Sequence, residues 1–466
     1  MGSFERKFLE SIFLESKGMV YGCDGKAIDR LCQFLIQSDF QPLNWLRVAG
    51  RIVRTLCVAV LGLISGGLLA QAMPAGGVNG VAEVSSLRID ATGKEKSITT
   101  VEEDRLPSAL NAMPELRVQI GTLKASWSVA LAASDSAADL FATVERQALG
   151  LWREHSAAVA ERAPFDDRGL YWQRLAIAPL VRARADVLGL TAAECATLIK
   201  RFEQASRGQT DIRWQPSSDL KVLMTGFDPF SLDRRIDQSN PSGLIALALD
   251  GQQFDVAGHR VEINSALFPV RYGDFDADIL EDWLQPIFQS TSLGLFVSVS
   301  MGRDQFDLER FPGRRRSSAA LGNLREHTGG SQASPQPPLY RGKPIDGAEF
   351  VEFSLPAAAM QLAEGAFQIR DNRRVTTLER GSFIASSLGM LQDQTAVLGS
   401  GGGYLSNEIS YRSIRLASNL NLDLPMGHIH TPSVFGHDPA RSTQMLKQVE
   451  AMVVRALKSE KGFGHD

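Results

Sequence analysis

The chain has 466 residues, of which 44% are hydrophobic and 22% are charged, and its formal net charge at pH 7 is −4. This composition is typical of a folded globular protein and excludes a disordered or low-complexity chain, while the length predicts two or more hydrophobic cores. The small negative charge argues against a basic nucleic-acid surface, so no nucleic-acid partner is expected.

The N-terminal segment has the pattern of an export signal. Arg47, Arg51 and Arg54 precede the uncharged apolar stretch TLCVAVLGLISGGLLAQA (55–72). A basic flank, an apolar run and a small-x-small exit are the three parts of a secretory signal. We therefore expect residues 47–72 to be a signal peptide cleaved after Ala72, which leaves a periplasmic or secreted bacterial protein without a membrane segment. An uncleaved anchor and a buried core helix are the alternatives.

Residues 1–46 form an unusually long leader for such a signal, and a start site assigned too far upstream is one explanation. Cys23, Cys32 and Cys57 lie in the leader and the signal, which leaves Cys195 as the one thiol of the expected mature chain. Export implies an oxidising compartment, but a single thiol cannot form an internal disulfide.

Two segments of different character follow the expected signal. Residues 73–107 contain Gly, Ser, Thr and a charged patch, and are expected to form a linker. Residues 108–217 are rich in Ala, Leu and Arg, with apolar residues at helical spacing, which predicts a small helical domain. Thr191 and Glu194 have the spacing of a capping box. The large aromatic residues expected in the core of this domain are Trp152, Tyr171 and Trp172.

From residue 218 onward, apolar strands alternate with helices. KVLMTGF (221–227) and LGLFVSVS (293–300) are predicted strands, and a helix is predicted over residues 274–290. Through 218–466 this alternation predicts a three-layer α/β/α domain with a mostly parallel sheet. Residues 312–348 interrupt the pattern as a long surface loop. The arginine run 314–316 within this loop is expected to be solvated rather than to bind an anion.

Polar residues gather where several predicted strands end, and open α/β sheets bind ligands beyond the carboxyl ends of their strands. TAVLGSGGGYLSNEISYRS (395–413) is predicted to form a strand, a glycine-rich turn and a helix, with Ser406 in the first helical turn. Backbone amides and the helix dipole favour an activated nucleophile there. The alternative is that Ser406 is only a helix-start residue, a role that serine often has.

Three histidines near the C-terminus do not indicate a metal site. No carboxylate or cysteine completes an obvious ligand set around His428, His430 and His437, so neither a metal nor another cofactor is expected. His428 is expected to point away from His430 on one strand and to be structural.

These segments together resemble the pyroglutamyl peptidase I family, cysteine peptidases that remove N-terminal pyroglutamate. The matching motifs, in chain order, are TGFDPF (225–230), NPS (240–242), GRDQFDLER (302–310), FSLP (353–356), GGYLSN (402–407) and GHIHTP (427–432). The resemblance covers residues 219–460 and not the helical segment before them. The resemblance is stronger evidence for the fold than for the reaction, because a fold does not determine chemistry.

The resemblance also implies roles for individual residues. Glu309 and His430 match the family's carboxylate and base, and Ser406 occupies the position of its nucleophilic cysteine. The positions implied for the substrate pocket are Phe227, Phe230, Asn240, Gly403 and Tyr404. Phe227 and Phe230 resemble the apolar pocket for the lactam ring, although plain core packing is an equal alternative.

The replacement of cysteine by serine leaves the function open. A hydroxyl is far less acidic than a thiol, so the base must take its proton during attack. The first hypothesis is an exported hydrolase that removes pyroglutamate or a related blocked residue from peptides with a Ser/His/Glu site. The alternatives are an inactive peptidase-fold module that binds peptides or a protein partner, and a deliberately altered cysteine enzyme. The oligomeric state is left open.

Overall fold

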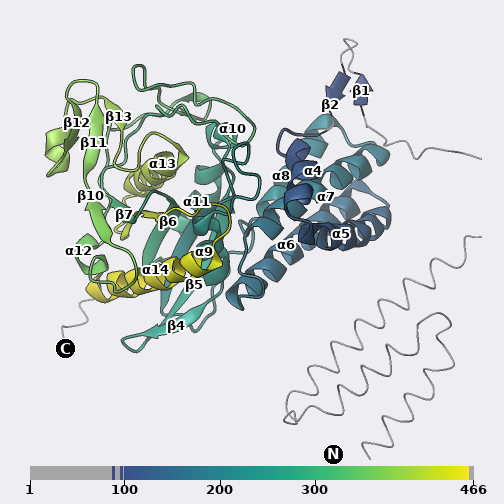
Figure 1. Cartoon of the computed structure of the whole chain (residues 1–466), viewed down its shortest axis with the longest axis horizontal. Helices are drawn as coiled ribbons and strands as arrows, with labels where there is room; N and C mark the ends of the chain where they lie inside the picture. The colour runs from purple at the N-terminus through teal and green to yellow at the C-terminus, as the bar shows by residue number, and fades with distance from the viewer. Residues whose placement is uncertain (1–86, 90–94, 98, 461–466) are drawn as a thin grey trace, which may run out of the picture. The chain divides into compact units, whose positions relative to one another are not determined.

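The computed structural model describes residues 87–89, 95–97 and 99–460 (Figure 1). The expected leader and signal peptide, and most of the expected linker, lie outside the described residues. Within the described ranges, no helix has both the length and the apolar character that crossing a membrane requires. The first described element is a small antiparallel pair of strands, β1 (Leu87–Ile89) and β2 (Glu95–Ser97).

Helices follow where helical periodicity predicts them. They are η2 (Glu103–Arg105), α4 (Leu106–Ala112), α5 (Glu115–Ala132), α6 (Ala137–Ala160), α7 (Arg168–Val187) and α8 (Ala192–Ala205). The capping box of Thr191 and Glu194 is confirmed at the start of α8, where each side chain bonds the backbone amide of the other residue. The three predicted core aromatics, Trp152, Tyr171 and Trp172, are all buried.

The helical region has a core of its own and also shares one with the region that follows. Trp127 and Phe202 pack within a cluster made by the helices alone. Leu151 and Trp152 of α6 instead belong to the main cluster, which continues into the sheet. The indole Nε1 of Trp152 also donates a hydrogen bond to Asp250, at 3.0 Å. The predicted boundary between residues 217 and 218 stays a prediction.

A seven-stranded sheet forms the centre of the α/β region. Its strands are β3 (Leu220–Phe227), β4 (Gln253–Val256), β5 (His259–Phe268), β6 (Leu295–Met301), β7 (Phe306–Glu309), β10 (Ile369–Asn372) and β14 (Met426–Thr431). Their order is β10-β7-β14-β6-β3-β5-β4. The pairs β10/β7, β14/β6, β6/β3 and β3/β5 are parallel, whereas β14/β7 and β4/β5 are antiparallel. The predicted α/β fold with a mostly parallel sheet is confirmed.

The helices of this region are α9 (Pro241–Leu249), α10 (Tyr272–Asp276), α11 (Ile279–Ser290), α12 (Ala357–Met360), α13 (Leu405–Asn419) and α14 (Pro439–Glu460). α9 packs on β3 and β5 and against α14, while α13 packs on β14 and β6 and against α11 (Figure 1). The central strands β3 and β6 are almost continuously buried, as expected for strands covered by helices. The single helix predicted over residues 274–290 is wrong, because Asp278 adopts a left-handed φ of 62° that separates α10 from α11.

An insertion between β7 and α13 forms small sheets beside the main one. It contains β8 (Leu339–Tyr340), β9 (Lys343–Pro344), β11 (Arg374–Thr377), β12 (Gly381–Ile384), η3 (Leu388–Leu391) and β13 (Ala396–Leu398). β11 lies between β12 and β13 in a three-stranded antiparallel sheet. The chain between β7 and β9 has no long strand, but it is anchored by bridges such as Arg316 with Gln336.

The prediction of a solvated arginine run is wrong. Arg316 is buried, and its guanidinium bonds both carboxylate oxygens of Glu408, at 2.6 and 2.9 Å, and Asp276, at 2.9 Å. Arg314 and Arg315 both pair with Glu349. Arg316 therefore links this loop to α10 and α13, because carboxylates far along the chain supply the counter-charges that the local sequence lacks.

Candidate active site

The candidate site lies where β3, β6 and β14 end. The parallel register of β14 and β6 places Thr431 beside Met301, so the segment after β6 begins next to the end of β14. β7 runs antiparallel along the other side of β14 and pairs Asp307 with His430. Glu309, at the end of β7, therefore comes close to the histidine. The three predicted catalytic residues, Glu309, Ser406 and His430, all line one cavity of about 560 Å³.

Glu309 and His430 form a close pair. Oε1 of Glu309 lies 2.5 Å from Nδ1 of His430, and Oε2 accepts a 2.8 Å hydrogen bond from the side-chain amide of Asn372. Burial raises the pKa of Glu309 above its ordinary value, although the neighbouring His430 ring and the Asn372 amide oppose the rise. With Nδ1 directed at the carboxylate, Nε2 is the ring nitrogen left to exchange a proton with a ligand.

Ser406 is placed as predicted but is not bonded to this pair. It is the second residue of α13, and its hydroxyl donates a 3.3 Å hydrogen bond to the carbonyl of Gly401. Within residues 99–460, no hydrogen bond joins this hydroxyl to His430. The backbone amides of Leu405 and Ser406 have no acceptor among the same residues. A helix N-terminus with such amides suits a developing negative charge.

A second, smaller pocket of about 30 Å³ adjoins Ser406. Its lining residues are Phe227, Phe230, Asn240, Val270, Ser300, Met301, Tyr404, Leu405 and Ser406. Four of the five residues predicted for the substrate pocket are thus brought together. Phe230, Tyr404 and Ser406 also line the large cavity, so the two spaces share a wall.

Gly403, the fifth predicted pocket residue, lines neither space. Its carbonyl accepts hydrogen bonds from the amides of Ser317 and Ser318, at 3.1 Å each. A Cβ built on Gly403 would lie 2.1 Å from the Ser317 hydroxyl, so this glycine is needed for close backbone approach. Gly403 therefore holds the turn against the preceding insertion.

His428 is buried, and its predicted orientation is wrong. Its Nδ1 and Nε2 lie 2.8 and 2.7 Å from the hydroxyls of Ser298 and Ser300, and burial lowers its pKa well below the ordinary value. Residues two apart on a strand point to the same face, and the rings of His428 and His430 are accordingly 4.8 Å apart. In the part of the chain that the structure describes, no cluster of three His, Cys, Asp or Glu side chains could hold a metal ion.

Comparison with known families finds a match for part of the helical region and another for part of the α/β region. The model for the PA0049 N-terminal domain covers residues 85–203, and that for the PA0049 C-terminal domain covers residues 221–355 and 385–435. The chain matches both PA0049 domains. An uncharacterized protein, PA0049 of Pseudomonas aeruginosa, is 29% identical over 350 residues. That alignment spans 57% of this chain and 63% of the relative, less than two thirds of its length.

Solved structures of pyrrolidone carboxyl peptidases are similar over about half of this chain. The enzyme from Pyrococcus furiosus is 20% identical, with a TM-score of 0.36, and the match covers 52% of this chain and 99% of the enzyme. The enzyme from Thermococcus litoralis is 16% identical with a TM-score of 0.36, covering 53% of this chain and 97% of the enzyme.

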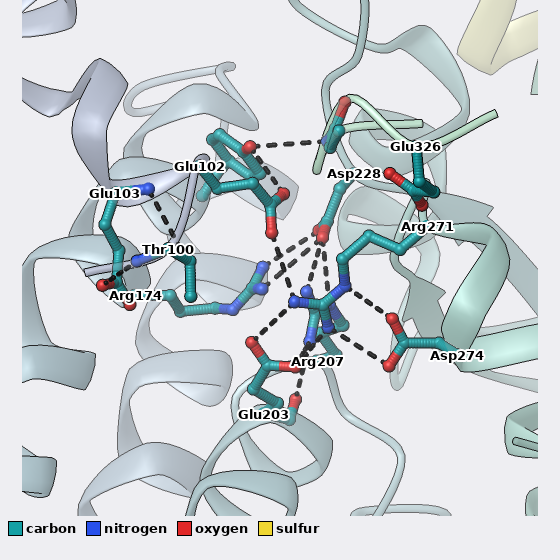
Figure 2. Close-up of polar contacts among 12 residues, drawn as sticks. Thr100, Glu102, Glu103, Arg174, Glu203, Arg207, Asp228, Arg271, Asp274 and Glu326 are labelled. Atoms are coloured by element: carbon teal, nitrogen blue, oxygen red, sulfur yellow. Dashed lines mark hydrogen bonds and ion pairs between the residues drawn. The ribbon is translucent and has the colours of Figure 1, made fainter. Parts of the chain in front are cut away.

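A buried charge cluster joins the segments matched by the two PA0049 models, and sequence reasoning missed it (Figure 2). Asp228, in the turn after β3, bonds Arg174 of α7 at 2.9 Å and Arg207, just after α8, at 2.8 Å. All three side chains are at most 2% exposed. Burial would raise the pKa of Asp228, but the two guanidinium groups hold it below its ordinary value. The helical region thus fixes the turn that follows Phe227, the last residue of β3, and carries Phe230.

The cluster continues to other segments of both regions. Arg271 pairs with Glu203 of α8, with Glu102 at 3.2 Å and with Asp274 at 2.7 Å (Figure 2). Glu203 also pairs with Arg207, at 3.3 Å. A charged residue between apolar neighbours, as Asp228 is in TGFDPF, is the one signal in the sequence. Its partners are 21 and 54 residues away, and no local pattern identifies them.

Proposed function

We propose that this protein is a hydrolase of the pyroglutamyl peptidase type, acting on peptides with a blocked N-terminal residue. Ser406 is the nucleophile, His430 the general base and Glu309 the carboxylate that orients the ring. The observation that carries the proposal is the buried pair of Glu309 and His430, 2.5 Å apart, at a cavity that Ser406 also lines. The motif resemblance supports the same assignment.

The proposed reaction follows from this geometry. The Ser406 side chain rotates from the Gly401 carbonyl towards Nε2 of His430, which takes the hydroxyl proton as the oxygen attacks the substrate carbonyl. The amides of Leu405 and Ser406 hold the resulting oxyanion. The imidazolium, stabilised by Glu309, then protonates the leaving amine. Water hydrolyses the acyl-enzyme by the same steps.

The small pocket beside Ser406 supports a small, largely apolar acyl group. Phe227 and Phe230 contribute its aromatic surface. Its volume of about 30 Å³ matches roughly one water molecule. A five-membered lactam therefore enters only when side chains that line this pocket move aside. The large cavity accommodates the residues that follow the blocked one.

We further propose that the protein is exported, with residues 47–72 as the signal. The basic flank, apolar run and Ala70-Gln71-Ala72 exit support this proposal. N-terminal sequencing of the protein from cells should then find a chain that begins at or near Met73, in the periplasm. Full-length protein in the cytosol would contradict it.

One observation favours a second candidate, a module that binds blocked peptides without cleaving them. The Ser406 hydroxyl bonds the Gly401 carbonyl rather than the histidine, at 3.3 Å. A site that holds its serine in this orientation can bind a peptide but cannot activate the hydroxyl.

Hydrolysis of a fluorogenic pyroglutamyl amide by the purified protein separates the two candidates. Ser406→Ala should abolish turnover while the substrate still binds, because only the nucleophile is removed. Ser418→Ala is the matched control, since Ser418 lies on the same helix, is exposed and lines neither pocket. Binding without turnover in the wild type would identify the binding module. Equal turnover by wild type and Ser406→Ala would overturn the assignment of the nucleophile.

A further inference from the structure

The large cavity has an excess of positive charge at its edge. Its lining includes four arginines, Arg105, Arg234, Arg303 and Arg374, and three carboxylates, Asp233, Asp307 and Glu309. A site that binds only an uncharged lactam and a neutral peptide backbone has no need of so many cations. Which of these arginines and carboxylates already form ion pairs within the protein determines the charge that a ligand in the cavity encounters.

Each carboxylate of the lining is already occupied. Asp233 pairs with Arg105 and Arg325, at 2.7 Å each. Asp307 pairs with Arg370, at 2.7 Å. Glu309 bonds His430 and Asn372. The negative charges of the cavity are therefore compensated within the protein.

Arg234, Arg303 and Arg374 are different. In the described part of the chain, none of these three guanidinium groups makes a hydrogen bond or ion pair, and all three residues are exposed. They come from separate segments: the turn after β3, the turn after β6 and the start of β11. Three unrelated segments thus each place a cation without a protein partner around one cavity.

We propose that these three arginines select substrates with a carboxylate on the leaving side of the scissile bond. This inference rests on the proposed function and names its substrate class. Arginine is suited to this task because its planar donors match a carboxylate and its charge is never lost. The carboxylate is an acidic side chain after the blocked residue or the free C-terminus of a short peptide.

Four substrates test the proposal and distinguish the two sources. They are pyroglutamyl-alanine amide, pyroglutamyl-glutamate amide, pyroglutamyl-lysine amide and pyroglutamyl-alanine with a free carboxylate. At low ionic strength, kcat/KM should be about ten-fold higher for the anionic substrates than for the neutral one, and lowest for the lysine amide. Added salt should reduce the difference, because exposed charges are screened. The glutamate amide tests an acidic side chain as the source of the carboxylate, and the free acid tests the C-terminus.

Variants assign the preference to these residues. Arg234→Gln, Arg303→Gln and Arg374→Gln should each reduce the anionic preference by about two- to five-fold, mainly through KM, as expected for exposed ion pairs. The kcat/KM of the neutral amide should fall by less than that of the anionic substrates. Arg455→Gln is the matched control, an exposed arginine on α14 that does not line the cavity.

The same preference can be measured without catalysis, which separates failure of this inference from failure of the proposed function. The four peptides are titrated into Ser406→Ala, and their affinities should follow the same order. Equal affinity for neutral and anionic peptides would overturn the inference, whether or not the wild type is active. Anionic preference in an inactive wild type would support the inference and contradict the hydrolase. If none of the four peptides bound, both this inference and the proposed hydrolase function would be overturned.

Discussion

The helical region and the α/β region contribute to the candidate site in different ways. The α/β region supplies the groups proposed for chemistry, at the ends of β7 and β14 and the start of α13. The helical region supplies two buried arginines, Arg174 and Arg207, that form ion pairs with Asp228 in the turn after β3. It also places Arg105 at the edge of the cavity. One region therefore carries the reacting groups and the other holds part of the pocket wall.

This division explains why so much charge is buried between the two regions. A buried ion pair is a weak source of stability by itself, because desolvation offsets most of the attraction, but removal of one partner is costly. We therefore infer that the main effect of the Asp228 cluster is to fix the position of the turn after β3. Asp228 lies between Phe227 and Phe230, so a shift of its turn moves the wall of the small pocket.

Substitutions in the α/β region should have the largest effect on activity. We expect His430→Ala to lower kcat/KM by about a thousand-fold or more, because the general base is lost. Glu309→Gln should cost less, since the carboxylate orients and stabilises the ring without touching the substrate. Steady-state kinetics measure both losses, with thermal unfolding as a check on the fold. A greater loss in Glu309→Gln than in His430→Ala would show that these roles are assigned wrongly.

A substitution in the helical region should instead affect stability and KM. We expect Arg207→Met to lower the free energy of unfolding by about 3 kcal/mol, because the buried Asp228 loses one of its two counter-charges. KM should rise with it, as the turn after β3 loosens. Urea unfolding and steady-state kinetics measure these effects.

The control for this variant is Arg201→Met on α8. Arg201 pairs with Glu145, and both side chains are largely exposed, at 51% and 44%. Its loss should cost less than about 1 kcal/mol. If the two variants were equally destabilised with unchanged KM, the proposal that the helical region positions the pocket wall would fail.

The last expected effect is a pH dependence of stability. Asp167 precedes α7 and accepts hydrogen bonds from the Ser239 hydroxyl, at 2.5 Å, and the Asn240 amide, at 2.8 Å. Burial raises the pKa of Asp167 from its ordinary 3.8 to about 7. Between these values the folded state holds a proton that the unfolded state has released. The free energy of unfolding should therefore fall as pH rises from about 4 to 7.

Asp167→Asn should flatten this part of the stability profile, because the amide does not titrate. Urea unfolding at several pH values measures the slope, and Asp135→Asn, an exposed aspartate of the same region, serves as the control. The same slope in the wild type and Asp167→Asn would show that the Asp167 carboxyl does not couple the helical region to the start of α9 in this way.

The sequence by itself determined the elements that carry the site. Apolar runs predicted β3 and β6, the glycine-rich turn predicted the start of α13 with Ser406 in its first turn, and the Thr191–Glu194 spacing predicted a helix cap. These features depend on residues within one or two turns of each other. Periodicity, capping and turn preferences act over that range, so they can be read locally.

Only the tertiary structure shows how distant side chains come into contact. Glu309 and His430 are 121 residues apart and come together because β7 runs antiparallel beside β14. Asp228 finds its counter-charges on elements outside the sheet, and Arg316 finds Glu408 92 residues away. Burying a charge requires a partner, but any of many distant residues could serve. Local propensity carries no information about strand order, and strand order determines those partners.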